Sequence, residues 1–311
     1  MSLNILFAGD ADKYAEYGAQ LRVDLAAKGI AATVSDAFAP DCVDFIVYEP
    51  TSGLADFAPY VRTKAVLSLW AGVENIVTNT SLTQPLARMA DSGLRDGMVE
   101  WVTGHVLRHH LGMDTHIHGQ DGVWRAGINP PLAKDRRVTI LGLGALGQAC
   151  ATALRGLGFA VSGWARTAKD LPDIQCFAGE DGLTAALTGT EIVVLLLPLT
   201  DKTRHMMNAR TIALLAPGAF VINPGRGPLI DDDALLAALD AGQVAHATLD
   251  VFATEPLPPA HPYWAHPCVT VTPHIASATR ASTACEFVVR NIARVMDGKP
   301  LLAQVDRAES Y

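Results

Sequence analysis

Cysteine is scarce in this sequence, and its cysteines are never close together. The 311-residue chain has five, Cys42, Cys150, Cys176, Cys268 and Cys285, and no C-x-x-C pair. An odd number of scattered cysteines does not support a disulfide framework, and unpaired spacing gives no zinc-binding pattern. We therefore expect reduced and mostly buried thiols.

Long hydrophobic runs are also missing. No apolar stretch approaches the roughly 18 residues needed to cross a bilayer, and the N-terminus MSLNILFAGD has no basic segment ahead of an apolar one. Half of the residues are nonetheless hydrophobic, enough for a large core, and this length favours two domains over one. We expect a soluble, cytoplasmic protein with no membrane partner.

The sequence also lacks an excess of positive charge. The chain has 24 Lys and Arg against 32 Asp and Glu, a net charge of −8. This balance argues against an extended basic surface for nucleic acid or anionic lipid. Any phosphate or carboxylate site must therefore be built from a few local residues.

Short apolar runs alternate with helical patterns along the whole chain, which is typical of an α/β protein with parallel sheets. Residues 97–118 form one long helical pattern, and residues 277–296 form an amphipathic one that we expect to return to the first domain. We predict two doubly wound, Rossmann-like domains, residues 1–97 plus 277–311 and residues 98–276. The second sheet should have six strands, in the stretches VTILG, FAVSGW, EIVVLLLP, GAFVINPG, VAHATLDV and CVTVTPH.

A glycine-rich turn, GLGALG, follows the strand VTILG directly. Gly142 would permit the tight turn, Gly144 would let backbone amides approach a pyrophosphate, and Gly147 would let helix and strand pack closely. Ala145 and Leu146 would begin the helix whose N-terminus faces the anion. A mere tight turn is the alternative, but the strand–turn–helix context favours a dinucleotide site.

The acidic residue expected about 20 residues after such a turn is absent. The second strand ends instead in Ala165-Arg166-Thr167. A carboxylate there would repel a 2′-phosphate, whereas an arginine can donate two charge-assisted hydrogen bonds to it. The stretch therefore favours NADP(H) over NAD(H), unless Arg166 is only a solvated surface residue and NAD(H) is accepted as well.

Three later stretches each supply a reactive side chain after a predicted strand, where open α/β sheets bind their ligands. They are Arg226 in INPGRGPLID, Glu255 in LDVFATEPLP and His274 in VTVTPHIAS. Each has an ordinary structural explanation alone: a turn arginine, a loop glutamate and a strand-end histidine.

Together with VTILGLGALGQ and LPLTDKTRHMMN, in this order and spacing, these stretches resemble the D-isomer-specific 2-hydroxyacid dehydrogenase family, and within it most closely the glyoxylate/hydroxypyruvate reductase A group. The resemblance covers most of residues 97–276. It implies a substrate-binding, flavodoxin-like first domain, a dinucleotide-binding second domain, an active site in the interdomain cleft and a homodimer. It also implies that Arg226, Glu255 and His274 are catalytic.

The chemistry of those three residues fits such roles. Reduction of a 2-oxo acid needs a proton donor at the carbonyl oxygen, and histidine has an unperturbed pKa of about 6.5, suited to donation near neutrality. Glu255 would favour the imidazolium of His274 and fix its tautomer. Arg226 would bind the substrate carboxylate and polarise the carbonyl.

Further positions match the family by order in the chain. Asp250 matches the residue at the nicotinamide, although it could equally cap the following turn. Pro198, Leu199 and Thr200 match a loop beside the dinucleotide, and Asn223 matches the residue before the Arg226 turn. Packing is a competing explanation for these four.

In the first domain the stretch Trp70-Ala71-Gly72-Val73-Glu74 corresponds to the family's Gly-x-Gly-x-Asp loop, whose amides bind the substrate carboxylate. Trp70 replaces the first glycine and Glu74 the aspartate. A tryptophan lining the site would favour small substrates, but it could instead point into the core.

Five histidines also cluster, at positions 105, 109, 110, 116 and 118. His105 and His109 have the i, i+4 spacing of a metal-binding helix, but no carboxylate or cysteine converges with them, and hydride transfer needs no metal. We predict no metal site.

The sequence thus predicts an NADPH-dependent reductase of small 2-oxo acids such as glyoxylate and hydroxypyruvate. Two alternatives remain: an NAD-linked dehydrogenase of a larger D-2-hydroxy acid, and a dinucleotide-sensing binding protein on the same fold.

Overall fold

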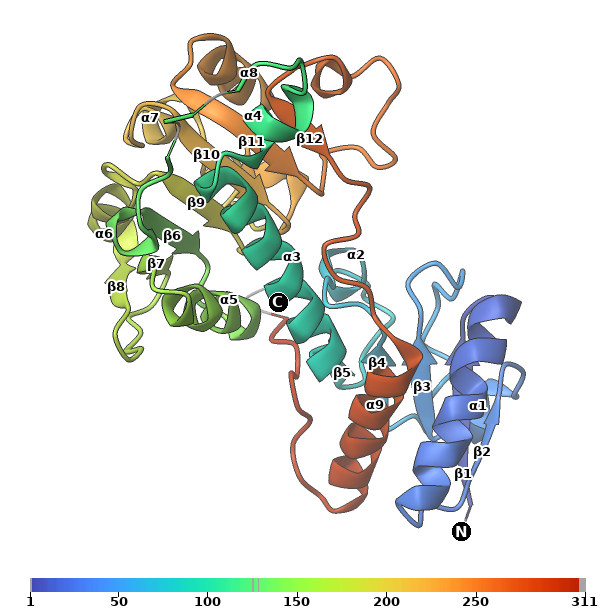
Figure 1. The fold of residues 1–311 in the computed structure, drawn as a ribbon. Coiled ribbons are helices and arrows are strands. Elements are labelled where there is room, and N and C mark those ends of the chain that lie inside the picture. The colour runs from blue at the N-terminus through green and yellow to red at the C-terminus, as the bar shows by residue number, and fades with distance from the viewer. Residues whose placement is uncertain (1, 125, 128, 308–311) are drawn as a thin grey trace. The chain divides into compact units, whose positions relative to one another are not determined.

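The structure is a computed structural model that describes residues 2–124, 126–127 and 129–307 (Figure 1). The chain divides into two compact units, the first made of Met1–Leu94 with Ala278–Tyr311 and the second of Arg95–Ser277. Among the helices of the described residues, none is long and apolar enough to cross a membrane.

The first unit is built on a five-stranded parallel sheet with the order β2-β1-β3-β4-β5. Residues Ile5 and Phe45 are neighbours across β1 and β3, and Phe45 and Ala65 across β3 and β4. The strands are β1 (Leu3–Ala8), β2 (Ala32–Ser35), β3 (Phe45–Tyr48), β4 (Ala65–Ser68) and β5 (Leu86–Ala87). The helices are α1 (Ala11–Ala27), α2 (Glu74–Val77) and α9 (Ala281–Met296), with a 3-10 turn at Pro40–Cys42.

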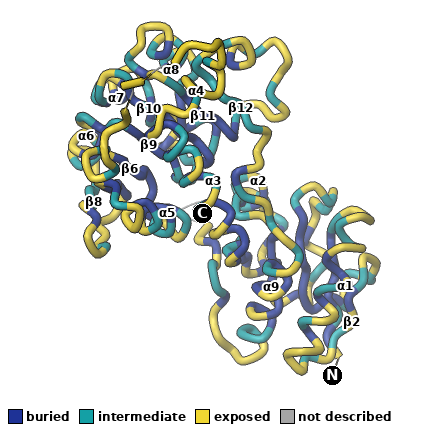
Figure 2. The backbone as a smooth tube through the Cα atoms, viewed as in Figure 1, coloured by how far each residue is buried: buried dark blue, intermediate teal, exposed yellow. Residues whose placement is uncertain are grey.

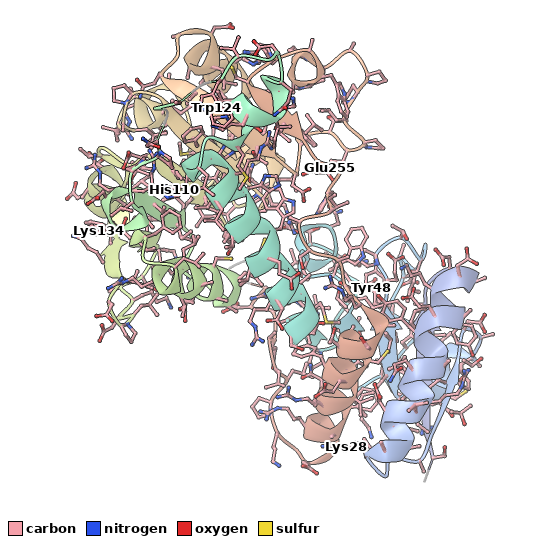
Figure 3. The ribbon with its side chains drawn as sticks, in the orientation of Figure 1. Lys28, Tyr48, His110, Trp124, Lys134 and Glu255 are labelled. Atoms are coloured by element: carbon pink, nitrogen blue, oxygen red, sulfur yellow. The ribbon has the colours of Figure 1, made fainter. Side chains whose placement is uncertain are left out.

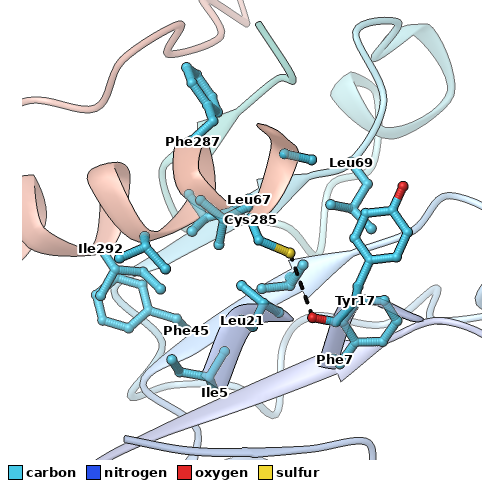
Figure 4. Packing of buried hydrophobic residues seen from close by; sticks show 14 of the residues in the cluster. Ile5, Phe7, Tyr17, Leu21, Phe45, Leu67, Leu69, Cys285, Phe287 and Ile292 are labelled. Atoms are coloured by element: carbon cyan, nitrogen blue, oxygen red, sulfur yellow. Dashed lines mark hydrogen bonds between the residues drawn. The ribbon is translucent and has the colours of Figure 1, made fainter. Parts of the chain in front are cut away.

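Side chains of alternate residues in this sheet enter two different hydrophobic clusters, as the period of a strand requires. On one face, Ile5, Phe45 and Leu67 pack against α1 and α9, which lie side by side (Figures 1 and 4). The Cys285 thiol on α9 donates to the carbonyl oxygen of Tyr17 on α1, 3.5 Å away (Figure 4). The predicted return of the last amphipathic helix to the first part of the chain is therefore confirmed.

The second unit contains a seven-stranded parallel sheet with the order β12-β11-β10-β9-β6-β7-β8. Its strands are β6 (Arg137–Leu141), β7 (Ala160–Ala165), β8 (Gln175–Ala178), β9 (Ile192–Leu195), β10 (Ala219–Asn223), β11 (Val244–Leu249) and β12 (Val269–Val271). The helices are α3 (Ser92–His110, which begins in the first unit), α4 (Met113–His118), α5 (Ala145–Gly156), α6 (Gly179–Leu187), α7 (Ala209–Ile212) and α8 (Asp232–Asp240). Further 3-10 turns lie at Ala133–Asp135, Gly227–Leu229 and Pro262–Trp264.

Helices cover both faces of this sheet. Ile192 and Val194 of β9 pack with residues of α3 and α5, while Val193 and Leu195 pack with residues of α6, α7 and α8. The central strand β9 is accordingly buried along its whole length (Figure 2). The predicted α/β architecture with two doubly wound, Rossmann-like sheets is confirmed.

Two predicted details are wrong. The second sheet has a seventh strand, β8, which is a short edge strand of only partly buried residues and so lacks the apolar run that marks the others. The helical pattern over residues 97–118 is two helices, because Gly112 adopts a left-handed backbone with φ +61° and separates α3 from α4. The first of them also begins earlier, at Ser92.

The cysteines are unpaired, as expected from their spacing. Only Cys150 and Cys285 are fully buried, and burial raises the pKa of both thiols to about 12. Cys42, Cys176 and Cys268 are partly exposed, so the expectation of mostly buried thiols is wrong.

Candidate active site

The predicted cofactor and catalytic residues of the second unit all follow strands of one parallel sheet. Since the strands run in the same direction, the segments after β6, β7, β9, β10, β11 and β12 emerge at one edge. Peptide groups at this carboxyl edge bind ligands in open α/β sheets. The structure therefore brings the sequence candidates of this unit to a single edge.

The glycine-rich turn after β6 is shaped by close backbone packing. Gly142 has φ +108°, and a Cβ there would lie 2.4 Å from the Leu196 carbonyl oxygen. A Cβ on Gly147 would lie 1.7 Å from the Gly142 oxygen, so only glycine lets α5 start this close to the strand.

Gly144 differs from the other two glycines because a Cβ there would meet nothing within 4 Å. It is the N-cap of α5, no side chain caps the helix, and the first turn, which Ala145 and Leu146 open, carries no acidic residue. The amides at this end therefore have no side-chain cap, and the space beside Gly144 is open.

The segment after β7 carries the candidate 2′-phosphate residues. Ala165 is buried as the last residue of the strand, while Arg166 and Thr167 are exposed. Trp164 turns away, because its indole Nε1 donates to the Gly179 carbonyl oxygen at 2.8 Å. The exposed end of this strand therefore carries an arginine and a threonine and no acidic residue.

The loop after β9 is closed by a threonine that the sequence analysis did not single out. The Thr203 hydroxyl donates to the Pro198 carbonyl oxygen at 2.7 Å and accepts from the Thr200 amide at 2.8 Å. Leu199 packs against the hydrophobic cluster beneath. The position of the Leu199 side chain is thus explained by packing, which was the alternative to a loop that contacts the dinucleotide.

His274 and Glu255 form the central pair of the site. His274 Nδ1 lies 2.6 Å from Glu255 Oε2. Because an ionised carboxylate can only accept, Nδ1 carries the proton of this hydrogen bond. Glu255 is itself oriented by the Phe252 amide, which donates to Oε1 at 2.9 Å, and it lies on the loop between β11 and β12 (Figure 3).

The His274 side chain is 52% exposed, so Nε2 can reach a ligand. Its backbone is strained, with φ +54°, a region that a residue with a side chain rarely adopts. The amide of His274 donates to the Asp250 carbonyl oxygen at 2.8 Å, which helps to hold this conformation.

Asp250 organises the segment that carries His274. Its fully buried carboxylate accepts hydrogen bonds from the Thr272 hydroxyl at 2.6 Å, the Ile275 amide at 2.9 Å and the Ala276 amide at 2.8 Å. This is the turn-organising role that the sequence left open as the alternative to a nicotinamide contact. The sequence analysis missed Thr272, whose only signal was its position two residues before the histidine.

Arg226 lies in a turn fixed by a buried asparagine. Asn223 Oδ1 accepts from the Gly225 amide at 3.1 Å, and its Nδ2 donates to the Arg226 carbonyl oxygen at 2.9 Å. A Cβ on the next residue, Gly227, would lie 2.0 Å from the Phe252 carbonyl carbon. The Arg226 turn is therefore packed directly against the start of the Glu255 loop.

In the first unit the stretch 70–74 follows β4. The Trp70 indole is 42% exposed and does not belong to the core, whereas Val73 is buried and precedes α2. The Trp70 amide donates to the Ser68 hydroxyl at 3.1 Å, and Ala71 and Gly72 are partly exposed. The backbone of residues 71 and 72 is thus partly accessible.

The histidines of α3 make separate contacts. His109 Nε2 lies 2.9 Å from the Thr248 hydroxyl and its ring stacks on Phe220, while His110 packs edge-on against Phe159. Within the part of the chain that the structure describes, no three His, Cys, Asp or Glu side chains converge as metal ligands do.

Burial has a strong effect on the pKa of two histidines, His109 on α3 and His246 on β11. It lowers the pKa of His109 to about 3, and His246 adds to this effect. It also lowers the pKa of His246 to about 4, with the Arg108 charge contributing. Both side chains are therefore neutral at physiological pH and serve packing.

The comparisons with known proteins agree with this arrangement. Residues 103–276 match the model of the D-isomer specific 2-hydroxyacid dehydrogenase NAD binding domain. The chain is 39% identical over 258 residues to glyoxylate/hydroxypyruvate reductase A of Serratia proteamaculans, covering 80% of this chain and 82% of the relative. It is 38% identical over 274 residues to the protein of that name from Yersinia enterocolitica, covering 86% and 87%.

Solved structures are similar over the full length. A D-isomer specific 2-hydroxyacid dehydrogenase from Xanthobacter autotrophicus, in complex with NADPH and MES, has a TM-score of 0.91 at 39% identity, with 100% of both chains covered. The NADPH-dependent glyoxylate/hydroxypyruvate reductase of Sinorhizobium meliloti, in complex with NADP and sulfate, has a TM-score of 0.86 at 31% identity, again with 100% of both chains covered. The chain therefore belongs to the D-isomer-specific 2-hydroxyacid dehydrogenase family, whose members are oxidoreductases.

Proposed function

We propose that this protein reduces small 2-oxo acids, glyoxylate and hydroxypyruvate among them, to 2-hydroxy acids with NADPH. The observation that carries the proposal is the 2.6 Å His274–Glu255 pair at the same sheet edge as the glycine-rich turn. The names of the relatives support the substrate class, and the NADPH and NADP in the similar structures support the cofactor.

The residues at this edge fit a dinucleotide phosphate. The α5 amides and the open space at Gly144 fit the pyrophosphate, and Gly142 and Gly147 hold the turn in place. Arg166 and Thr167 bind the 2′-phosphate, so NADP(H) is preferred and NAD(H) binds more weakly. Bound NADPH supplies the hydride that reduces the substrate carbonyl carbon.

His274 supplies the proton. With Nδ1–H donated to Glu255, the second proton of the imidazolium sits on Nε2, which donates it to the carbonyl oxygen as charge develops there. The nearby carboxylate stabilises the imidazolium and holds the ring in one orientation. In the oxidative direction the neutral ring accepts the proton at Nε2.

Arg226 binds the substrate carboxylate through its planar guanidinium and polarises the carbonyl group. In the first unit, the amides of residues 71–73, beside Trp70, are donors suited to a carboxylate. The Asn223 hydrogen bonds and the Asp250 network fix the backbones from which Arg226 and His274 extend.

The protein also acts as a homodimer in this proposal. Exposed apolar side chains are concentrated in one segment of the second unit, namely Leu111, Met113, Ile117, Val123, Trp124 and Leu132. Such a surface is costly in a monomer and is typical of a protein interface.

The test is the initial rate of NADPH and NADH oxidation with glyoxylate, hydroxypyruvate, pyruvate and phenylpyruvate. The proposal expects fast NADPH turnover with glyoxylate and hydroxypyruvate. An NADH preference with the largest substrate would favour the NAD-linked dehydrogenase instead. Dinucleotide binding without turnover of any of the four acids would favour the sensing protein.

A further inference from the structure

Arg88 lies at the carboxyl end of the first unit's sheet, beside the stretch 70–74. It follows β5 directly, and the Met89 amide donates to the Trp70 carbonyl oxygen at 2.9 Å. The pairing of β4 and β5 therefore continues past both strands. Arg88 is thus a close neighbour of Trp70 and Ala71.

The direction of the Arg88 side chain follows from its neighbours. Ala87 and Met89 enter the cluster under α1 and α9, whereas Leu86 enters the opposite cluster together with Val73. Since residues of an extended chain alternate between faces, Arg88 shares the face of Leu86. Its guanidinium therefore extends on the side of Val73 and α2.

This guanidinium is only half-exposed, and it makes no hydrogen bond or ion pair within 4 Å among residues 2–124, 126–127 and 129–307. The charge of Glu74 acts on it, but burial is the stronger effect and lowers the pKa of Arg88. Within those same residues Asp91 forms no ion pair with Arg88, and its Oδ1 accepts a hydrogen bond from the Leu94 amide at the start of α3.

A half-buried guanidinium without hydrogen-bonding partners gives up part of its hydration, and no acceptor in the described part of the chain replaces it. A partly buried charge without a protein partner is typical of a residue whose partner is a ligand. In the proposed function the amides of residues 71–73, in the same unit as Arg88, are donors suited to the carboxylate of the ligand. An additional cation beside these amides is therefore suited to a second oxygen atom of the same ligand.

We propose that Arg88 is a specificity-determining residue that donates a hydrogen bond to the C3 hydroxyl of the substrate, so that the enzyme discriminates hydroxypyruvate from pyruvate. This inference rests on the proposed function and adds to it the group on the substrate that the protein selects. The two acids differ only in that hydroxyl, which makes them a matched pair.

The experiment compares kcat/KM for hydroxypyruvate, pyruvate and glyoxylate, with saturating NADPH, in the wild type, R88Q and R88K. R290Q is the control, because Arg290 is an exposed arginine of α9 in the same unit. We expect R88Q to lower the hydroxypyruvate-to-pyruvate ratio by about tenfold to a hundredfold, the range of one hydrogen bond to a charged donor. R88K should lower that ratio less than R88Q does, and R290Q should leave it unchanged.

The hydroxypyruvate-to-pyruvate ratio of kcat/KM distinguishes an effect on substrate specificity from an effect on folding. A general loss of folding or of carboxylate binding would lower kcat/KM for all three acids equally and leave the ratio unchanged. An unchanged ratio in R88Q overturns the role of Arg88 while wild-type turnover keeps the proposed function intact. If the wild type reduces none of the three acids, the proposed function fails and the role of Arg88 fails with it.

Discussion

At the scale of single residues, the site depends on backbone conformations that other residues hold in place. His274 has a left-handed backbone, and Asp250 holds both its amide and the two amides that follow it. A strained residue persists only where its surroundings determine it, and such strain is concentrated at functional positions. The backbone that carries His274 is therefore fixed by hydrogen bonds within the protein itself.

Replacing His274 with glutamine removes the proposed proton donor and keeps a polar side chain of similar size. We expect H274Q to lower kcat for glyoxylate by at least about a hundredfold, because general acid catalysis contributes roughly 10²- to 10⁴-fold. NADPH affinity, measured by quenching of tryptophan fluorescence, should change little. Substantial residual turnover in H274Q would contradict the role of His274.

Replacing Arg166 with alanine tests cofactor choice. R166A should raise KM for NADPH by about tenfold to a hundredfold, since it loses charge-assisted hydrogen bonds to the 2′-phosphate. KM for NADH, which has no such phosphate, should be nearly unchanged. Equal changes for the two cofactors would refute the assignment of Arg166.

At the scale of elements, the sequence predicted those that carry strong local signals. The central strands of the second sheet are continuous apolar runs, and the glycine-rich turn is required by contacts of 1.7 Å and 2.4 Å that a Cβ would make. The strand β8 and the break at Gly112 were missed, because short edge strands and single turn glycines have little periodicity. The Thr203 hydrogen bonds lie within an irregular loop that has no periodic pattern, and the Thr272 hydrogen bond joins residues 22 positions apart.

Two glycines of the β6–α5 turn provide a matched pair of variants. G147A forces a Cβ against the Gly142 oxygen, so we expect a loss of about 1–3 kcal/mol in the free energy of unfolding. G144A meets open space and should fold with unchanged stability, yet it should weaken NADPH binding by filling the anion cradle. Denaturant unfolding and NADPH titration of both variants test this, and a stable G147A would contradict the packing argument.

The contact between α3 and β11 should make stability depend on pH. His109 has a pKa of about 3 when folded and an ordinary value when unfolded, so the unfolded chain binds more protons below about pH 6.5. Stability is then complete above this pH and falls as pH decreases toward 3, by up to about 1.4 kcal/mol per pH unit.

The variant H109Q keeps a polar group beside Thr248 and cannot titrate in this range. Its melting temperature should fall less than that of the wild type between pH 7 and pH 5. The pH dependence of the melting temperature that remains in H109Q should come in part from His246, because its pKa of about 4 also makes stability fall as pH decreases. Parallel melting curves for the two proteins over this range would show that His109 does not contribute.

At the scale of the whole molecule, the chain combines two parallel sheets with different surroundings. The first sheet is covered on one face by two long helices and on the other by α2 and loops, whereas helices cover both faces of the second. The segment after α3 adds exposed apolar side chains to the second unit, among them Trp124, which is 92% exposed (Figure 3). A net charge of −8 disfavours random association of copies, so this apolar segment needs a specific partner.

A second copy of the chain is the partner expected from the family resemblance. The wild type should sediment as a dimer, and the double variant I117S/W124S should sediment as a monomer, because it removes two exposed apolar side chains from the segment. The control V61S removes an equally exposed apolar side chain from the first unit and should leave the dimer intact. A monomeric wild type, or a double variant that remains dimeric at low protein concentration, would show that this segment does not form the interface.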